Sequence, residues 1–231
     1  MTEVVIPDSV ISIGDNAFEH CSSLTGIVIP DSVTSIGHAA FWCCSSLTSI
    51  VIPDSVTSIG EKAFVLCGSL TEITVSEKNA NYKDIDGNLY SKDGKALVQY
   101  AEGKNETTFS IPDSVTSIGD GAFEYCSSLT SIVIPDSVTS IGNYAFFDCS
   151  SLSEIVIPES VTSVGNNAFS SCDSLTNVYY KGSVAEWLQI TIEFGNEDLT
   201  EETIYYYSEQ APTEEGNFWY YDENGDIAVW G

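Results

Sequence analysis

The sequence has few positive charges. It contains no arginine, and its seven lysines are outnumbered by 34 acidic residues, which gives a formal net charge of −27. Nucleic acids and anionic lipid headgroups are bound through lysine and arginine contacts, so a strongly acidic surface repels both. We therefore expect no nucleic-acid partner, and we expect the surface to attract cations.

Long apolar stretches are absent as well. No run of 18 apolar residues occurs, so the sequence predicts no membrane span. No signal peptide is recognised ahead of the first repeat. Hydrophobic residues nevertheless make up 43% of the chain, which is enough to form a folded core.

Catalytic signatures are missing too, since no GxSxG, HExxH, P-loop or GxGxxG pattern occurs. The two histidines, His20 and His38, occupy non-equivalent positions and are interpreted as solvated residues. A polysaccharide lyase would need cations to neutralise a uronate, and no carboxylate pair at about 5–10 Å is singled out for a glycosidase. We predict no enzyme and no catalytic residue, and a carbohydrate-active β-solenoid enzyme remains as a remote alternative.

The chain does contain a regular 23-residue repeat, clearest at residues 134–156, IPDSVTSIGNYAFFDCSSLSEIV. The pattern returns at 6–28, 29–51, 52–74, 111–133 and 157–179. A short fixed period marks a solenoid, in which each repeat contacts only its neighbours. The 231 residues therefore fit a single array.

Each repeat is predicted to contain two short extended pieces and a little helix. Residues 132–134 are β-branched and favour a strand, and the Pro-Asp pair at 135–136 favours a turn. Residues 138–141 form a second extended piece, and the apolar spacing within 145–149 favours one or two helical turns. Stacking would bury one apolar residue of each repeat in a spine formed by Phe18, Phe41, Phe64, Phe123, Phe146 and Phe169.

The cysteines follow the same period. Stacked equivalents would lie roughly 4.8 Å apart with parallel side chains, whereas a disulfide needs Cβ atoms nearer about 3.8 Å. A line of thiols also lacks the tetrahedral corners of a zinc site. We predict free thiols, no metal site and no cofactor. Six cysteines share one repeat position, Cys21, Cys44, Cys67, Cys126, Cys149 and Cys172, and Cys43 is the seventh.

The pattern LxxIxIPxSVTSIGxxAFxxCxxL resembles the BspA-like leucine-rich repeat family over residues 1 to about 180. The resemblance implies an α/β leucine-rich repeat solenoid, with a curved parallel β-sheet on one side and short helices or turns on the other. It also implies an adhesive or ligand-binding role at the cell surface or outside the cell, largely in bacteria. It implies no catalysis, and the family has no fixed catalytic residues to carry over.

An insertion at about residues 76–105 separates the third and fourth repeats. Asp93-Gly94 lies between two apolar segments and predicts a hairpin. Phe109 and Ile111 restore the strand pattern, so we expect the sheet to continue through the insertion. Five of the seven lysines lie here, and they are interpreted either as solvated residues or as a cationic contact point: Lys78, Lys83, Lys92, Lys95 and Lys104.

The repeat stops near residue 180, and residues 181–231 are predicted to form a β-rich, aromatic and acidic cap. Ser183 and Glu186 have the spacing of a capping box, which predicts a short helix through about Ile190. At the other end, Met1 falls at a core leucine position without a polar capping segment before it. Because solenoid ends normally need one, we interpret the sequence as a fragment of a longer protein.

Three aromatic segments follow the predicted helix of the cap. Residues 205–207 are typical of a strand, and residues 218–221 and 227–230 flank Asn224-Gly225, a strong hairpin turn. We interpret them as closing the last repeat with aromatic bulk. An aromatic carbohydrate-binding platform is the alternative that remains open for this region.

The parallel sheet should have eight strands, centred on Val4, Ile27, Ile50, Ile73, Phe109, Ile132, Ile155 and Val178. The residue after each centre points outward, which gives the column Val5, Val28, Val51, Thr74, Ser110, Val133, Val156 and Tyr179. The neighbouring outward column is Glu3, Gly26, Ser49, Glu72, Thr108, Ser131, Glu154 and Asn177. Exposed valines beside a polar edge predict an interaction surface, although strand propensity and repeat duplication also explain them. The candidates from these columns are Val28, Val51, Glu72, Val133, Glu154, Val156 and Tyr179.

The two residues after each Ala-Phe pair vary most between repeats. Among them Trp42, Tyr125 and Phe147 are large, and they are candidate contact residues if they are exposed. Packing against neighbouring repeats is the alternative.

The acidic column of the Pro-Asp turns could bridge calcium, but turn geometry explains it without metal. That column is Asp8, Asp31, Asp54, Asp113, Asp136 and Glu159.

The resemblance, together with the absence of catalytic signatures, implies a noncatalytic module of a bacterial surface or secreted protein. We expect it to bind a protein or a glycan and to be a monomer. A passive spacer that holds another domain away from the cell is the second hypothesis. The residues do not identify the ligand.

Overall fold

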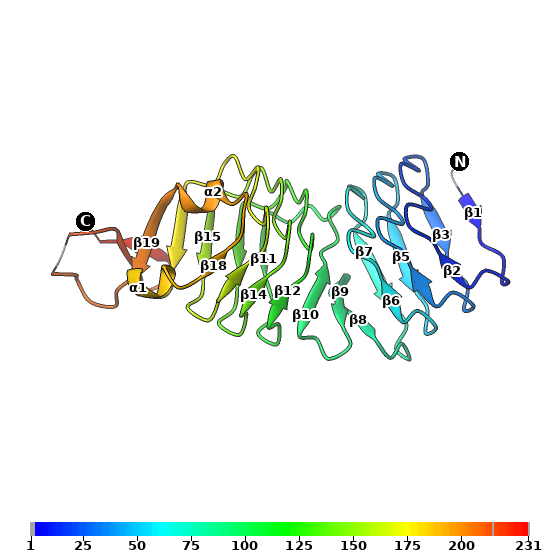
Figure 1. Cartoon of the computed structure of the whole chain (residues 1–231), viewed down its shortest axis with the longest axis horizontal. Coiled ribbons are helices and arrows are strands. Elements are labelled where there is room, and N and C mark those ends of the chain that lie inside the picture. Colours follow the sequence, from blue (N-terminus) through cyan, green and yellow to red (C-terminus); the bar gives the residue numbers. More distant parts are fainter. Residues whose placement is uncertain (1–2, 214, 231) are drawn as a thin grey trace.

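The computed structural model describes residues 3–213 and 215–230. The chain winds into a parallel β-solenoid whose coils follow one another along the long axis, with strand β1 near one end and the C-terminal strands at the other (Figure 1). Met1, predicted at a core position, lies outside the described residues.

Two rows of short strands run along the solenoid. The first row consists of β1 (Glu3–Val5), β3 (Gly26–Val28), β5 (Ser49–Ile52), β7 (Glu72–Val75), β11 (Thr108–Ser110), β13 (Ser131–Val133), β15 (Glu154–Ile157), β17 (Asn177–Tyr180) and β19 (Thr203–Tyr207). The second row includes β2 (Ser12–Ile13), β4 (Ser35–Ile36), β6 (Ser58–Ile59), β12 (Ser117–Ile118), β14 (Ser140–Ile141), β16 (Ser163–Val164) and β18 (Thr191–Ile192). All eight predicted strand centres lie in strands of the first row, which confirms their positions. The single eight-stranded sheet was wrong, because the nine described strands of this row belong to three separate sheets.

The register shows that one repeat makes one coil. Ile132 of β13 pairs with Ile155 of β15, and Ser140 of β14 pairs with Ser163 of β16. Each pair joins equivalent residues of consecutive repeats. Side-chain ladders follow the same register, as when Thr139 Oγ1 donates to the Thr116 carbonyl at 3.2 Å. The Ser-Val-Thr motif therefore satisfies carbonyls of the preceding coil.

The first row does not continue through the insertion, so that expectation was wrong. The strands of the insertion, β8 (Tyr82–Ile85), β9 (Asn88–Ser91) and β10 (Ala96–Gln99), join the second row in the order β12-β10-β9-β8. Strand β7 consequently pairs with β5 alone and β11 with β13 alone. The turn at Gly87 lies against β7, where the Ile73 amide donates to the Gly87 carbonyl at 2.9 Å. The predicted hairpin at Asp93-Gly94 is confirmed by the antiparallel pairing of β9 with β10.

The Ala-Phe segments are turns, and the predicted helical turns there are wrong. Tyr144 and Asp148 have φ angles of 55° and 53°, and left-handed residues end a helix. Alternate backbone amides donate to the next coil, and those between them donate to the carbonyl three residues earlier in the turn. Phe146 N, for example, donates to the Ala168 carbonyl at 2.7 Å. Within the described ranges, helices occur only after the repeats, as α1 (Val184–Trp187) and α2 (Glu197–Thr200).

The predicted phenylalanine spine is present, with an interruption. The rings of Phe123 and Phe146 stack at 5.1 Å with an angle of 7°, and Phe18, Phe41 and Phe64 stack in the same way. The two runs do not meet, because the insertion places Tyr100 against Phe123 at 5.3 Å. The buried side chains accordingly form two main clusters, one on each side of the insertion.

The seven cysteines are free thiols, as predicted. The thiol of Cys149 donates to the Phe123 carbonyl of the preceding coil at 3.2 Å, and Cys172 bonds Phe146 in the same way. Burial raises the pKa of the Cys44 thiol to about 12. A thiol that stays protonated is a poor nucleophile and metal ligand. The hydrogen bonds of Cys149 and Cys172 show that these two buried thiols take part in the packing between coils.

The strand ladders run past residue 180, because β18 extends the second row and β19 the first. The predicted capping box is confirmed, with Ser183 N donating to Glu186 Oε2 at 2.8 Å. Helix α1 ends at Trp187, earlier than the predicted Ile190. Strand β20 (Phe218–Tyr221) pairs with β19 and forms the predicted hairpin with β21 (Ile227–Val229).

A candidate interaction face

The outward side of the first row carries the predicted valine column. In the N-terminal coils these side chains face solvent, with Val5 88%, Val28 78% and Val51 56% exposed. Their neighbours Ile27 and Ile50 are buried, as the alternation of a strand requires. The sequence therefore placed the apolar residues of this part of the face correctly.

A hollow of about 400 Å³ lies along this part of the column, and we call it the valine hollow. Its lining includes Val5, Gly26, Val28, Ser49 and Val51. A Cβ added at Gly26 would meet no atom within 4 Å, so a side chain there would fill the hollow without a clash. The absence of a side chain at Gly26 thus leaves this part of the hollow open, which no motif had marked.

Acidic residues stand at one border of the valine hollow. A neighbouring depression of about 430 Å³ shares Val28 and Val51 with it and is also lined by Asp31 and Asp54. Both aspartates belong to the Pro-Asp turns and are exposed. The face thus combines apolar side chains with exposed carboxylates.

The C-terminal part of the same column is covered by the chain itself. Val133 is 49% exposed, but Val156 and Tyr179 are buried, and their predicted exposure was wrong. Both pack in one cluster with Trp219 of β20, whose ring centroid lies 5.5 Å from that of Tyr179. The hairpin of β20 and β21 thus folds onto the outward side of the last coils.

The two acidic candidates of the neighbouring column differ in their surroundings. Glu72 is exposed beside the insertion. Glu154 is half-buried next to Tyr179, and burial together with the Glu154 charge raises the pKa of the Tyr179 phenol. Glu154 therefore borders the covered part of the face, whereas Glu72 borders the interruption of the first row.

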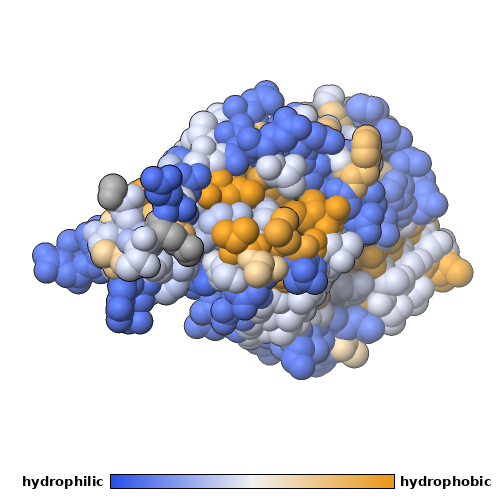
Figure 2. Space-filling model, turned by 60° about the vertical axis from the view of Figure 1, so that its left-hand side comes forward, coloured by the Kyte–Doolittle hydropathy of each residue, from blue (hydrophilic) through white to orange (hydrophobic). Residues whose placement is uncertain are grey.

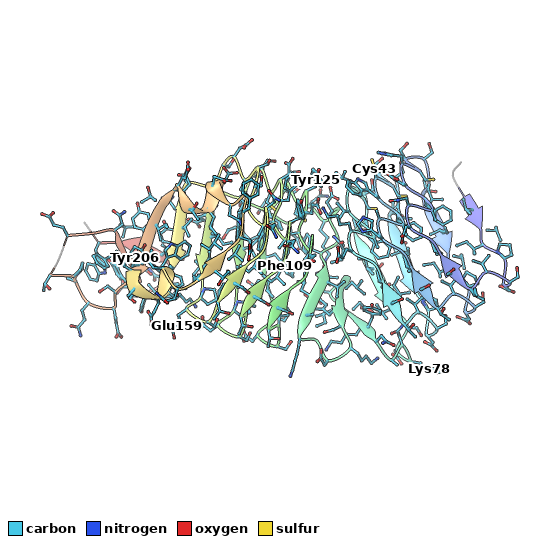
Figure 3. The ribbon with its side chains drawn as sticks, in the orientation of Figure 1. Cys43, Lys78, Phe109, Tyr125, Glu159 and Tyr206 are labelled. Atoms are coloured by element: carbon cyan, nitrogen blue, oxygen red, sulfur yellow. The ribbon has the colours of Figure 1, made fainter. Side chains whose placement is uncertain are left out.

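The three candidates among the variable residues after Ala-Phe, Trp42, Tyr125 and Phe147, lie on the turn side and are half-buried. Tyr125 and Phe147 pack edge to face across adjacent coils at 5.6 Å, and Tyr144 contacts Phe147 at 5.7 Å. This geometry favours the packing alternative for Tyr125 and Phe147. Figure 3 shows Tyr125 on the opposite edge of the molecule from Glu159.

Lys62 contacts residues on both sides of the insertion. Its ammonium lies 3.0 Å from Glu124 Oε1 and 3.8 Å from the ring centroid of Tyr144, with Trp42 at 5.8 Å. Burial raises the pKa of Glu124 and raises that of Glu102, also at this seam, to about 7. Trp42 is thereby part of an internal contact, which no sequence motif indicated.

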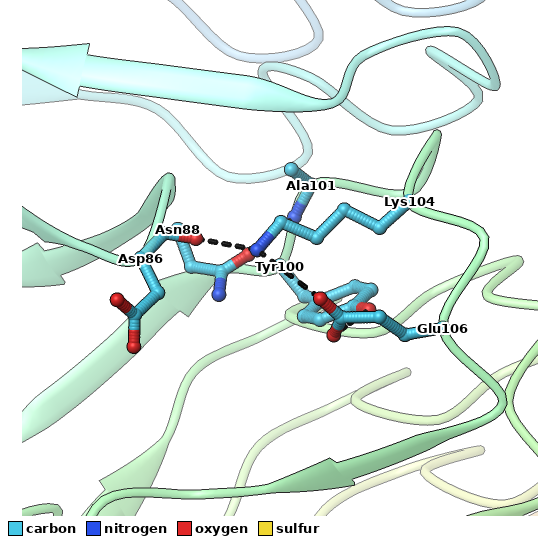
Figure 4. Close-up of polar contacts among 6 residues, drawn as sticks. All are labelled: Asp86, Asn88, Tyr100, Ala101, Lys104 and Glu106. Atoms are coloured by element: carbon cyan, nitrogen blue, oxygen red, sulfur yellow. Dashed lines mark hydrogen bonds and ion pairs between the residues drawn. The ribbon is translucent and has the colours of Figure 1, made fainter.

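The insertion lysines do not act together. Lys104 donates to the Asp86 carbonyl, lies 4.0 Å from Glu106 Oε1 and faces the Tyr100 ring at 5.6 Å (Figure 4). Its contacts are therefore within the insertion and with Glu106, directly after it. Lys78 is exposed and lies at the edge of the molecule (Figure 3). Only some of these lysines are thus free to contact a partner.

Further exposed apolar side chains occur at the C-terminal end, namely Val184, Leu188 and Phe194. Figure 2, which brings this end forward, shows an apolar area bordered by hydrophilic residues. None of the helices in the described ranges has the length and apolar character needed to cross a bilayer.

Comparison with known families identifies the repeat. The family described as BspA type Leucine rich repeat region matches six copies, over residues 1–92 and 99–205. The chain belongs to the BspA-type leucine-rich repeat family. Members of this family are scaffolds and are generally non-catalytic. Among the curated proteins, none matches this BspA-type chain.

Solved bacterial structures share the fold. A leucine-rich repeat protein from Eubacterium ventriosum is 25% identical with a TM-score of 0.65, over 90% of this chain and 67% of its own. A leucine rich cell surface protein from Faecalibacterium prausnitzii is 33% identical with a TM-score of 0.54, over 83% and 62%. The pneumococcal vaccine antigen PcpA, at 23% identity and a TM-score of 0.73 over 89% and 56%, shows the fold alone. The BspA-type chain thus spans only about half to two thirds of these proteins.

Proposed function

We propose that this chain is a noncatalytic interaction module at the cell surface or outside the cell, and that it binds a protein ligand through the valine hollow. The observation that carries the proposal is the difference in solvent exposure along the valine column. Val28 and Val51 are open to solvent, whereas Val156 and Tyr179 are covered by the hairpin. The face is therefore covered over the last coils and open over the N-terminal coils, where contiguous apolar surface often marks a binding site.

The ligand that fits this face has apolar side chains flanked by lysine or arginine. Apolar groups would fill the depression at Gly26, and basic groups would meet Asp31 and Asp54 at its border. The net charge of −27 would steer such a partner toward the module and raise its association rate. Surface location is supported by the family and by the printed name of the Faecalibacterium protein.

A peptide array in which apolar content and basic charge vary independently tests the proposal. Peptides that carry both should bind, and the Val28→Asn/Val51→Asn double variant should lose that binding. Val133→Asn, which changes an exposed valine of the other half, is the matched control and should bind normally. Equal binding by all variants, or a blank array, would reject the proposal, and a blank array would favour a passive spacer.

The spacer hypothesis has one structural observation in its favour. The solenoid is elongated, and its first and last described strands lie at opposite ends (Figure 1). A module of that shape could separate two attached domains without binding anything. The array distinguishes the two functions because a spacer needs no accessible apolar hollow.

A further inference from the structure

A second concave site lies at the opposite end of the molecule from the valine hollow. It is a cleft of about 680 Å³ between the turns of the last repeats and the C-terminal cap. Pockets of about 300–1,000 Å³ are typical of small-ligand sites. Its lining combines two tyrosine rings with carboxylates, a serine and one lysine, and it includes Glu159, which lies close to the cap (Figure 3).

One wall of the cleft is aromatic and firmly supported. Tyr207 and Tyr221 are 38% and 42% exposed, and their ring centroids lie 6.2 Å apart. Both rest edge to face on the buried ring of Trp219, at 5.2 and 4.9 Å. The Trp219 indole N–H donates to the Tyr180 carbonyl at 2.9 Å, which fixes the support. The two tyrosine rings are thus held in place by Trp219 and present apolar ring surface to the cleft.

The other wall supplies hydrogen-bond acceptors and one donor. The Lys181 ammonium lies 2.7 Å from Asp136 Oδ1 and 6.0 Å from the Tyr221 ring centroid. Within the described residues, no hydrogen bond or ion pair engages the Glu159 carboxylate. Hydrogen bonds from Ser183 lower the pKa of Glu186 and use its Oε2 atom, so this group stays ionised.

This lining decides the class of ligand. The ring surfaces match an apolar face, the carboxylates match hydroxyl donors, and Lys181 can donate to a ligand oxygen, whereas the Ser160 hydroxyl already donates to the Val138 carbonyl at 2.6 Å. A uronate or another acidic sugar would be repelled by Glu159 and Glu186. The lining has three carboxylates against one ammonium, so a cationic peptide is the competing ligand class, and an arginine-rich probe tests it. A neutral sugar has both the apolar ring face and the hydroxyl groups that the cleft requires.

We propose that this cleft is a binding site for a neutral saccharide, which stacks on Tyr207 and Tyr221 and donates hydroxyl hydrogen bonds to Glu159. The site is separate from the valine hollow and does not depend on the function proposed there. Because the two sites share no lining residue, either proposal can be wrong while the other holds.

Titration calorimetry with the full chain and defined oligosaccharides tests the proposal. The probes are hexaoses of glucose, mannose and N-acetylglucosamine. At least one should bind, and Tyr221→Ala should weaken binding roughly tenfold or more by removing the ring. Glu159→Gln should weaken binding to a similar degree, because it replaces the charged acceptor of the ligand hydroxyl by a neutral one. Glu159 is exposed, so this change should not disturb the fold.

Asp113→Asn is the matched control, since Asp113 occupies the same turn position as Glu159 two repeats earlier and lines no part of the cleft. It should leave the affinity unchanged. A heptapeptide rich in arginine serves as the competing probe. Absence of binding by all three hexaoses, binding that neither cleft variant weakens, or binding of the arginine peptide alone would each overturn the saccharide proposal.

Discussion

The indole of Trp219 covers Tyr179, with ring centroids 5.5 Å apart and the planes tilted by 60°. This contact closes the outward face of the last coils, and it depends on a parallel pairing of β19 with β20. Val28 and Tyr179 occupy the same position in two different repeats, and this contact explains why Val28 is exposed and Tyr179 is buried.

Trp219→Ala should remove the support of the cap. Trp219 is fully buried, so its truncation should lower the free energy of unfolding by about 3–5 kcal/mol. Urea denaturation followed by tyrosine fluorescence measures the change. Trp219→Phe keeps most of the apolar contact and should cost clearly less. Equal stability of the alanine variant and the wild type would show that the hairpin does not cover the face.

The phenylalanine spine gives a prediction with a neighbouring control. Phe146 is fully buried between Phe123 and Phe169, so Phe146→Ala should cost about 3–5 kcal/mol. The adjacent Phe147 is half-buried, and Phe147→Ala should cost less. Chemical denaturation compares the two. A smaller loss for Phe146 than for Phe147 would contradict the stacked interior.

The glycine of the Ser-Ile-Gly motif is required by the distance between coils. A Cβ at Gly142 would lie 2.7 Å from the Asp120 amide nitrogen, whereas one at the equivalent Gly14 would meet nothing within 4 Å. Gly142→Ala should therefore destabilise the protein by roughly 1–3 kcal/mol. Gly14→Ala should have little effect. The melting temperatures of both variants provide the measurement. An equal decrease in melting temperature for both would refute the close approach of Gly142 to the backbone of Asp120.

Glu102 predicts a dependence of stability on pH. Burial raises its pKa to about 7 from the usual 4.5, although amides of Leu66 and Cys67 partly oppose the shift. The folded state therefore holds a proton that the unfolded state releases, and its Oε2 has no hydrogen-bond partner among the described residues. The stabilising effect is complete below about pH 4.5 and is lost as the pH rises through about 7.

The Glu102→Gln variant isolates this contribution, because the other acidic groups are unchanged. The difference in unfolding free energy between variant and wild type should grow in favour of the variant by on the order of 1–3 kcal/mol between pH 4.5 and 8. Denaturation curves across that range measure it. A constant difference would show that Glu102 titrates normally in the folded protein.

The repeat period predicted the coil, the strand centres, the free thiols and the phenylalanine spine, because each depends only on contacts between equivalent residues. The Ala-Phe turns were mispredicted because their apolar spacing suits a helix, while inter-coil hydrogen bonds hold Tyr144 and Asp148 at positive φ. The spacing of apolar residues within one repeat gives no information on hydrogen bonds between coils.

The limits of the candidate face have a similar cause. Exposure of Val156 depends on where the distant β20 docks, and the period ends before that strand begins. The interruption between β7 and β11 also depends on which row the insertion strands join. A second Asp-Gly pair, Asp86-Gly87, was the available signal for the additional strand β8.

Covalent footprinting with a photolysed diazirine, read by mass spectrometry, tests most directly whether the outward face is open at one end and closed at the other. Labelling should be several-fold higher at Val28 and Val51 than at Val156 and Tyr179, in line with their exposure. Equal labelling of the four positions, or stronger labelling at Val156 and Tyr179, would contradict the account.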